Sequence, residues 1–82
     1  MRYEQLTINQ ATVRQILFDQ EYDYEQGSAY PLISIGTYAA SGEELRQSQG
    51  EFIRKADEAL YKAKGLGRNR IVAYKDLFPP RD

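Results

Sequence analysis

Leu32-Ile33-Ser34-Ile35-Gly36-Thr37-Tyr38 is a continuous β-rich run in a chain of 82 residues. Because it is not alternating in polarity, the run is typical of a strand near the middle of a sheet. Pro31 cannot donate a hydrogen bond to a neighbouring strand, so it marks the start of this strand. Gly36 within the run indicates a bulge or a close approach by another backbone. The run therefore predicts a buried strand that needs a neighbour on each side.

Downstream of this strand, residues 51–64 carry a strong helical pattern. Apolar side chains recur at three- and four-residue spacing, and charged ones take the opposite side. The apolar positions are Phe52, Ile53, Ala56, Ala59, Leu60 and Ala63. Gly65 is expected to supply the left-handed residue that stops the helix, and residues 70–74 (Arg-Ile-Val-Ala-Tyr) predict a short final strand.

Upstream, residues 6–18 predict an amphipathic helix, with Leu6, Val13, Ile16 and Leu17 on one face. Residues 21–26 alternate acidic and aromatic side chains, which predicts a strand. Gly27 and Ser28 then form the turn of a hairpin with the strand after Pro31. Residues 39–50 are a polar connection, with a short helical turn over residues 43–47.

These elements predict an α+β fold of the order helix, β-hairpin, helix, strand. The expected sheet is small and mainly antiparallel, and two helices cover it. A sheet of about three strands is marginal at this chain length. The pattern therefore indicates a chain that is incomplete or that pairs with another chain.

Composition excludes several classes of site. Apolar residues make up 41% and charged residues 28% of the chain, as in ordinary globular proteins. There is no cysteine and no histidine, which excludes thiol ligands, disulfides and an imidazole base. This usage fits a reducing, cytoplasmic setting, and neither a signal peptide nor an apolar run of membrane-spanning length is present.

Charge is uneven along the chain although the net charge is -1. Residues 62–75 hold five basic side chains and no acidic one, at the end of the predicted helix. Residues 19–25 hold four acidic side chains and no basic one, and this stretch is expected to keep a strand edge soluble. Lys64 and Arg68 flank the Gly65-Leu66-Gly67 turn. An ammonium and a rigid guanidinium fork at such a turn suit phosphate oxygens, although cations at a helix C-terminus also interact favourably with the helix dipole.

Three short motifs stand in a fixed order. They are Ile-Ser-Ile-Gly at residues 33–36, Ala-Asp-Glu-Ala-Leu-Tyr-Lys-Ala-Lys at residues 56–64 and Gly-Arg-Asn-Arg at residues 67–70. Together they resemble the C-terminal part of GGDEF domains, the diguanylate cyclases, which have a nucleotidyl-cyclase-like fold. The resemblance covers about residues 6–75, so we expect residues 1–78 to be the C-terminal half of such a domain and residues 79–82 to be a tail.

The resemblance implies roles for three residues. Lys64 and Arg68 match the family's lysine and arginine that reach the triphosphate of GTP. Arg14 matches, with an ambiguous register, an arginine of the family's product-inhibition site. In the intact domain two GTP molecules are joined into cyclic di-GMP with the help of Mg²⁺.

The family's signature hairpin and its metal-binding aspartate precede everything in this chain. The resemblance therefore implies no catalytic residue and no metal ligand here, and a chain that is inactive alone. Residues 41–45 (Ser-Gly-Glu-Glu-Leu) imitate the signature but follow the central strand, and we expect them to form a surface loop.

Two alternatives remain. The chain could be a degenerate, non-catalytic remnant that acts as an interaction module, forming a homodimer or associating through an exposed sheet edge. Nucleic-acid binding through residues 62–75 is the weaker alternative because the whole chain is net acidic. GTP and cyclic di-GMP are the partners expected in the intact domain, with no nucleic acid and no membrane contact in this segment.

Overall fold

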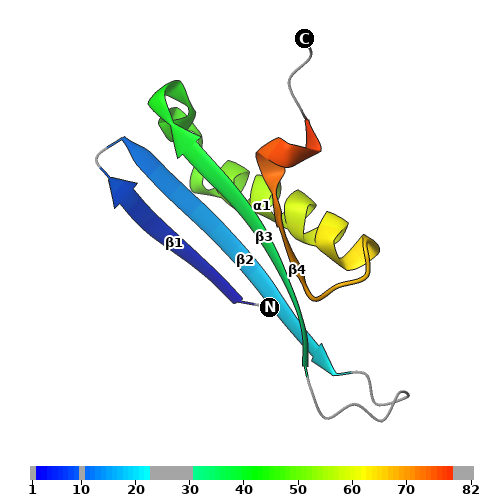
Figure 1. Ribbon diagram of the computed structural model, residues 1–82. Helices are drawn as coiled ribbons and strands as arrows, with labels where there is room; N and C mark the ends of the chain where they lie inside the picture. The colour runs from blue at the N-terminus through cyan, green and yellow to red at the C-terminus, as the bar shows by residue number, and fades with distance from the viewer. Residues whose placement is uncertain (1, 10, 23–30, 79–82) are drawn as a thin grey trace.

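A computed structural model describes residues 2–9, 11–22 and 31–78, which form a four-stranded sheet and one α-helix (Figure 1). The elements are β1 (Arg2–Asn9), β2 (Thr12–Tyr22), β3 (Pro31–Ser41), the 3-10 helix η1 (Gly42–Arg46), α1 (Gln49–Gly65), β4 (Arg70–Ala73) and the 3-10 helix η2 (Tyr74–Leu77). The strand order is β1-β2-β3-β4, with the first three strands antiparallel and β4 parallel to β3. The predicted α+β class and the mainly antiparallel sheet are confirmed, with one α-helix in place of two.

The predicted helix over residues 6–18 is wrong, because this segment forms the end of β1 and most of β2. The strand period is visible in the burial: Gln15 and Leu17 are buried, whereas Arg14 is exposed. β3 pairs with β2 along its whole length, from Thr12 opposite Ser41 to Tyr22 opposite Pro31. That long backbone ladder overrides a helical spacing that already contained several β-branched residues.

The other predicted elements are largely confirmed. β3 begins at Pro31 but continues to Ser41, three residues into the predicted polar connection. α1 contains the whole of residues 51–64, and η1 begins and ends one residue earlier than the short turn expected at residues 43–47. The last strand, β4, is shorter by one residue than predicted. The first two residues of the strand expected over residues 21–26 belong to β2, and the rest of it, with the Gly27-Ser28 turn, lies outside the described residues.

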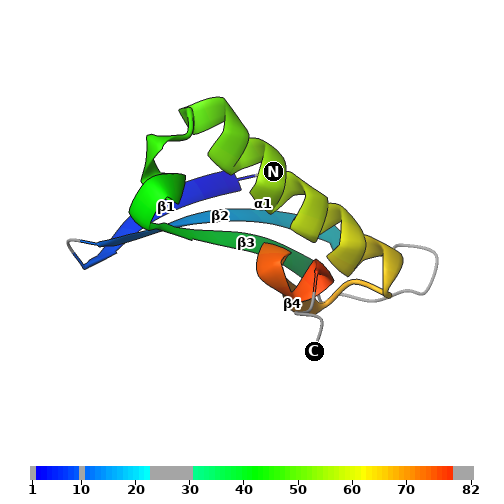
Figure 2. The same ribbon diagram turned by 90° about the horizontal axis from the view of Figure 1, so that it is seen from above.

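α1 lies along one face of the sheet, and the core fills the space between them (Figure 2). The buried apolar residues are Leu17, Tyr38, Ala40, Phe52, Ala56, Ala59, Leu60 and Ala63. η1 and η2 extend this core, because Leu45 and Tyr74 pack against it. Three alanines on the buried side of α1 leave little side-chain bulk under the helix, so its backbone comes close to β3.

α1 approaches β3 closely at Gly36, which is one of the two alternatives that a glycine within a strand predicted. A Cβ atom there would lie 2.2 Å from the backbone nitrogen of Leu60 and 2.3 Å from the carbonyl oxygen of Ala56. Neither α1 atom belongs to a side chain that could rotate away. Gly36 therefore sets the distance between helix and sheet, and with it the position of the whole of α1.

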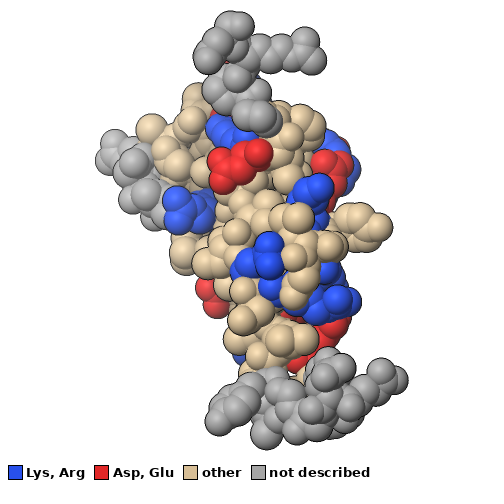
Figure 3. Space-filling view, turned by 45° about the vertical axis from the view of Figure 1, so that its right-hand side comes forward, with Lys and Arg blue, Asp and Glu red and all other residues tan. Residues whose placement is uncertain are grey.

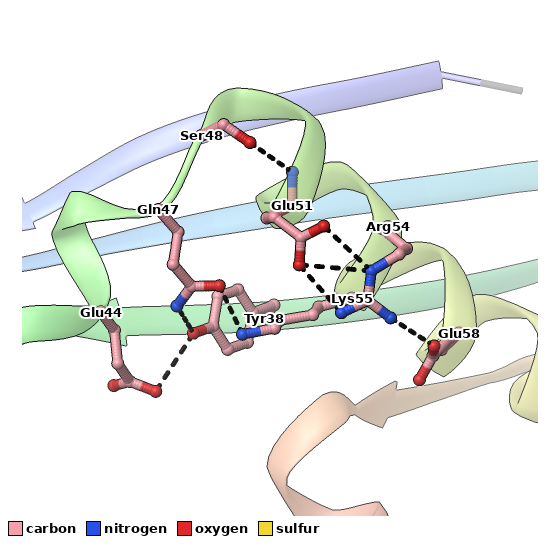
Figure 4. Close-up of polar contacts among 8 residues, drawn as sticks. All are labelled: Tyr38, Glu44, Gln47, Ser48, Glu51, Arg54, Lys55 and Glu58. Carbon is pink, nitrogen blue, oxygen red and sulfur yellow. Dashed lines mark hydrogen bonds and ion pairs between the residues drawn. The ribbon is translucent and has the colours of Figure 1, made fainter.

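Polar contacts fix the N-terminal end of α1 (Figure 4). The backbone N–H of Glu51 donates to the Ser48 hydroxyl, which caps the helix. Gln47 donates to the Tyr38 hydroxyl at 2.8 Å and accepts from the ammonium of Lys55. These contacts tie the connection after η1 to the central strand, so the helix starts at a defined point.

Candidate functional site

The C-terminal end of α1 is held by a compact turn over residues 66–69. The N–H of Leu66 donates to the carbonyl of Lys62 at 3.0 Å, and the N–H of Arg68 donates to the carbonyl of Ala63 at 3.0 Å. These bonds satisfy carbonyls that the helix leaves without a partner. The turn thus gives Arg68 a fixed position three residues after the end of α1.

The left-handed residues in this turn differ from the prediction. Gly65 stays inside α1, and positive φ angles occur instead at Gly67 (118°), Arg68 (62°) and Asn69 (53°). Glycine adopts such angles freely and asparagine tolerates them, whereas an arginine is disfavoured there. The side chain of residue 68 is therefore aimed by a backbone conformation that its type does not favour.

Lys64 and Arg68 together reach two carboxylates on β2. Lys64 forms an ion pair with Asp19 and lies 3.8 Å from Oε1 of Glu21. Nε of Arg68 donates to Oε2 of Glu21 at 2.6 Å. Asp19 and Glu21 are two residues apart on one strand, so they project toward the same face of the sheet as the buried Leu17. We call these four residues the charged corner.

Both signs of charge meet at this part of the surface. Figure 3 shows Lys and Arg atoms over both halves of the described surface, with a large group at the lower right that has Asp and Glu atoms beside it. The side chain of Asp19 is 19% exposed and that of Lys64 is 29% exposed, so water screens this pair only partly. Arg68 and Glu21 are more open to solvent. The charged corner is therefore accessible to an anion.

The ammonium of Lys64 holds the pKa of the Asp19 carboxyl below its usual value of 3.8, chiefly through its hydrogen bond. Burial acts in the opposite direction, and the attraction between the two charges adds to the lowering. Asp19 is therefore ionised at neutral pH. It competes with any anion that approaches Lys64.

Two shallow hollows adjoin the charged corner. One of about 340 Å³ is lined by Tyr61, Lys64, Gly65 and Arg68. The other, of about 250 Å³, is lined by Glu21, Tyr22, Leu32 and Arg68. Arg68 is common to both, and the larger one has the size of the smaller ligand pockets in proteins. A phosphate chain lying along the end of α1 would meet Lys64 and Arg68 from the side of Tyr61.

Arg14, the third residue singled out in the sequence, lies elsewhere. It is on β2, opposite Leu6 of β1 and Ala39 of β3. Its neighbour Gln15 is buried toward α1, and strand side chains alternate, so Arg14 projects from the opposite face of the sheet. The structure brings Lys64 and Arg68 together and leaves Arg14 apart from them.

Asp19 and Glu21 were missed as partners of the basic residues because the acidic stretch reads as a solubilising strand edge. The available signal was the spacing of two acids at i and i+2, which places both on one face of a strand. That signal could not be used because the predicted helix ended at residue 18 and the predicted strand began at residue 21, which left Asp19 outside the strand.

The segment that imitates the family signature ends β3 and forms η1. Glu44 within it accepts hydrogen bonds from Lys75 at 2.9 Å and from the Tyr38 hydroxyl at 3.1 Å. The Lys75 ammonium is the main cause that lowers the pKa of Glu44. Through these contacts, Glu44 connects η1 to the core.

Comparisons with protein-family models, curated proteins and solved structures find no match to this chain. Among the residues that the structure describes, no helix is long and apolar enough to cross a bilayer.

Acid should weaken the Asp19–Lys64 ion pair. Because the folded-state pKa of Asp19 is lowered, its stabilisation is complete above the unfolded-state pKa and disappears as pH falls through the folded-state value. We expect the free energy of unfolding to drop by about 1 kcal/mol from this pair as pH falls from about 5 through the lowered folded-state pKa of Asp19. Urea denaturation followed by circular dichroism at several pH values measures it. In Asp19→Asn this part of the pH dependence should be absent, and an unchanged profile would contradict the assignment.

Proposed function

We propose that this chain is the C-terminal part of a diguanylate cyclase domain of the GGDEF family and that Lys64 and Arg68 form a phosphate-binding corner for GTP. The single observation that carries the proposal is the convergence of these two side chains at the end of α1. An ammonium and a guanidinium that meet beside an open hollow are suited to a triphosphate, whose charge they neutralise and whose oxygens they orient.

The three motifs behind the proposal also occupy connected positions in the fold. Gly36 of the first motif lies under α1, against Leu60 of the second motif. The second motif ends at Lys64, and the third forms the turn that aims Arg68. One continuous unit of strand, helix and turn thus supports the corner, which is what a rigid binding element requires.

The intact domain is proposed to use Mg²⁺ with GTP. Among the described residues there is no group of three or more acidic side chains that could hold a metal ion. Asp19 and Glu21 are instead directed at Lys64 and Arg68. The role proposed for this chain is therefore to bind and orient phosphate, and we assign no step of metal chemistry to it.

A nucleotide titration tests the proposal. We expect the purified chain to bind GTP or tripolyphosphate weakly, at about millimolar affinity, and to make no cyclic di-GMP when Mg²⁺ is added. NMR shift changes should centre on residues 64–68, and the double variant Lys64→Ala/Arg68→Ala should abolish them. Lys62→Ala, an exposed lysine of the same helix end, is the matched control and should bind as well as the parent chain.

Either of two results would count against this function. Robust cyclic di-GMP synthesis would contradict an inactive fragment. Binding that ignores the double variant, or that the Lys62 control reduces equally, would show a nonspecific attraction to the basic stretch.

A second candidate function, a non-catalytic interaction module, is favoured by one observation. Lys64 and Arg68 already have carboxylate partners within the chain, so a phosphate must displace an ion pair to bind. A chain that associates with itself and ignores GTP would support this alternative.

A further inference from the structure

The face of the sheet opposite α1 is apolar at its centre. No helix in the described part of the chain packs on it, since α1, η1 and η2 all contribute to the core on the other side. Phe18, Ile16 and Ile35 project there from the two central strands, and Ile71 of β4 is 69% exposed. Antiparallel sheets that face water normally present polar residues on that side. A face of this composition is typical of an interaction site.

Strand register arranges this face in rows that cross the sheet. One inner row is Arg2, Phe18, Ile35 and Ile71, from β1 to β4. The adjacent inner row is Glu4, Ile16, Thr37 and Ala73. On β1 the first row carries a positive charge and the second a negative one. On β3 and β4 the first row carries large side chains and the second small ones.

We propose that a second copy of this chain covers this face, forming a two-fold symmetric dimer with the two sheets stacked. The two-fold axis lies between the sheets, runs across the strands and passes between the two inner rows. Each strand then lies over the same strand of the partner, in the opposite direction. Such an interface is isologous, so every contact occurs twice.

Charge complementarity supports this partner and this register. The axis places Arg2 opposite the partner's Glu4, and Glu4 opposite the partner's Arg2. Packed sheets lie about 10 Å apart and cross at about 30°, and both side chains are long enough to meet across that space. Two exposed edge residues of opposite charge thus become two ion pairs that fix the orientation of the copies.

Side-chain size gives an independent argument. Ile35 lies opposite the partner's Thr37, and Ile71 lies opposite the partner's Ala73. In the outer rows, Ile33 lies opposite the partner's Ala39 by the same symmetry. Large side chains therefore meet small ones along β3 and β4, which is how two sheet faces interdigitate.

The area of the face is sufficient for a modest dimer. At roughly 3.3 Å per residue and about 4.8 Å between strands, the four strands cover about 540 Å² in projection. Corrugation by side chains increases the accessible surface above this value, toward the roughly 800 Å² per partner of a standard interface. We therefore expect a dissociation constant in the micromolar range.

The dimer does not depend on the phosphate proposal, because Lys64 and Arg68 lie on the α1 side of the sheet. Sedimentation equilibrium over about 5–200 μM measures the association. The parent chain should reach twice its 9.5 kDa mass. Thr37→Arg, on a central strand that edge pairing does not use, should weaken association about thirtyfold or more because each copy inserts a charge opposite Ile35.

Charge reversal tests the register. Arg2→Glu should weaken the dimer about tenfold, and the double variant Arg2→Glu/Glu4→Arg should restore it to within about threefold. Arg46→Glu, exposed on η1, changes the net charge equally and should have no effect. Circular dichroism of each variant confirms that the fold is kept.

Three results would overturn the proposal. A monomeric parent chain at the highest concentration would show that something other than a second copy covers the face. Unchanged association of Thr37→Arg would indicate pairing at a sheet edge instead. Failure of the double charge reversal to recover association would exclude the two-fold register.

Discussion

Replacing Gly36 with alanine is expected to destabilise the fold by about 3 kcal/mol. The new methyl group would stand 2.2 Å from the Leu60 nitrogen and 2.3 Å from the Ala56 oxygen. Both are backbone atoms, so the contact can be relieved only if α1 moves away from β3. That movement would open the packing around Leu17 and Leu60, which are both 1% exposed. A domain of this size rarely has more than about 3–5 kcal/mol of stability, so most of it would be lost.

Gly65→Ala is the matched control for this prediction. Gly65 is the last residue of α1, where a Cβ atom meets nothing within 4 Å and the φ angle is not positive. The same added methyl group should raise the free energy of unfolding by about 0.5–1 kcal/mol through its effect on helix propensity and on the unfolded chain. Urea denaturation followed by circular dichroism measures both variants. Equal effects at the two glycines would show that the close approach of α1 and β3 has no energetic consequence.

Neutralising the acidic half of the charged corner is expected to increase phosphate affinity by about tenfold or more. In the double variant Asp19→Asn/Glu21→Gln, Lys64 and Arg68 lose their carboxylate partners without losing the shape of the site. An incoming triphosphate then no longer displaces the ion pairs of Lys64 and Arg68, each worth at most about 1 kcal/mol. Titration with tripolyphosphate, followed by calorimetry or NMR, measures the gain.

The control is a double variant on α1 that changes the net charge of the chain by the same amount. Glu51→Gln/Glu58→Gln removes the two partners of Arg54, at 3.0 Å and 2.7 Å, without touching the charged corner. Its phosphate affinity should rise by less than about twofold, which is the effect of net charge alone. An equal rise in both double variants would indicate that the carboxylates of Asp19 and Glu21 do not compete for the proposed site.

Sequence reasoning succeeded where local chemistry and tertiary context agree. Pro31 marks the start of β3 because its ring leaves it few conformational options. Gly36 predicts a bulge or a close backbone approach, and the structure shows the close approach, with α1 as the neighbour. The apolar spacing of residues 51–64 predicts α1 because the buried face continues for several turns. Its exact end was less accessible, since the left-handed residues at 67–69 include an arginine, the type for which such a conformation is not expected.

Sequence reasoning failed where the apolar spacing of a short amphipathic segment fits both a helix and a strand. Within residues 12–18, Val13, Ile16 and Leu17 have a helical spacing. Pairing with β3 makes this segment a strand, so its side chains alternate between the two faces of the sheet. This misassignment also hid the charged corner, because Asp19 and Glu21 face Lys64 and Arg68 only when β2 is a strand. The positions of Lys64 and Arg68 at a helix end were accessible from sequence, whereas their partners required the sheet register.

The turn after α1 combines a cost in backbone energy with a defined position for one side chain. Arg68 at φ 62° and Asn69 at φ 53° occupy a region that is disfavoured by roughly 1–2 kcal/mol for residues other than glycine. Glycine at position 68 would relax the backbone, but it would remove the guanidinium that reaches Glu21. The ion pair of Arg68 with Glu21 offsets part of that backbone cost. The turn therefore holds the Arg68 guanidinium beside Glu21, the carboxylate that Lys64 also approaches.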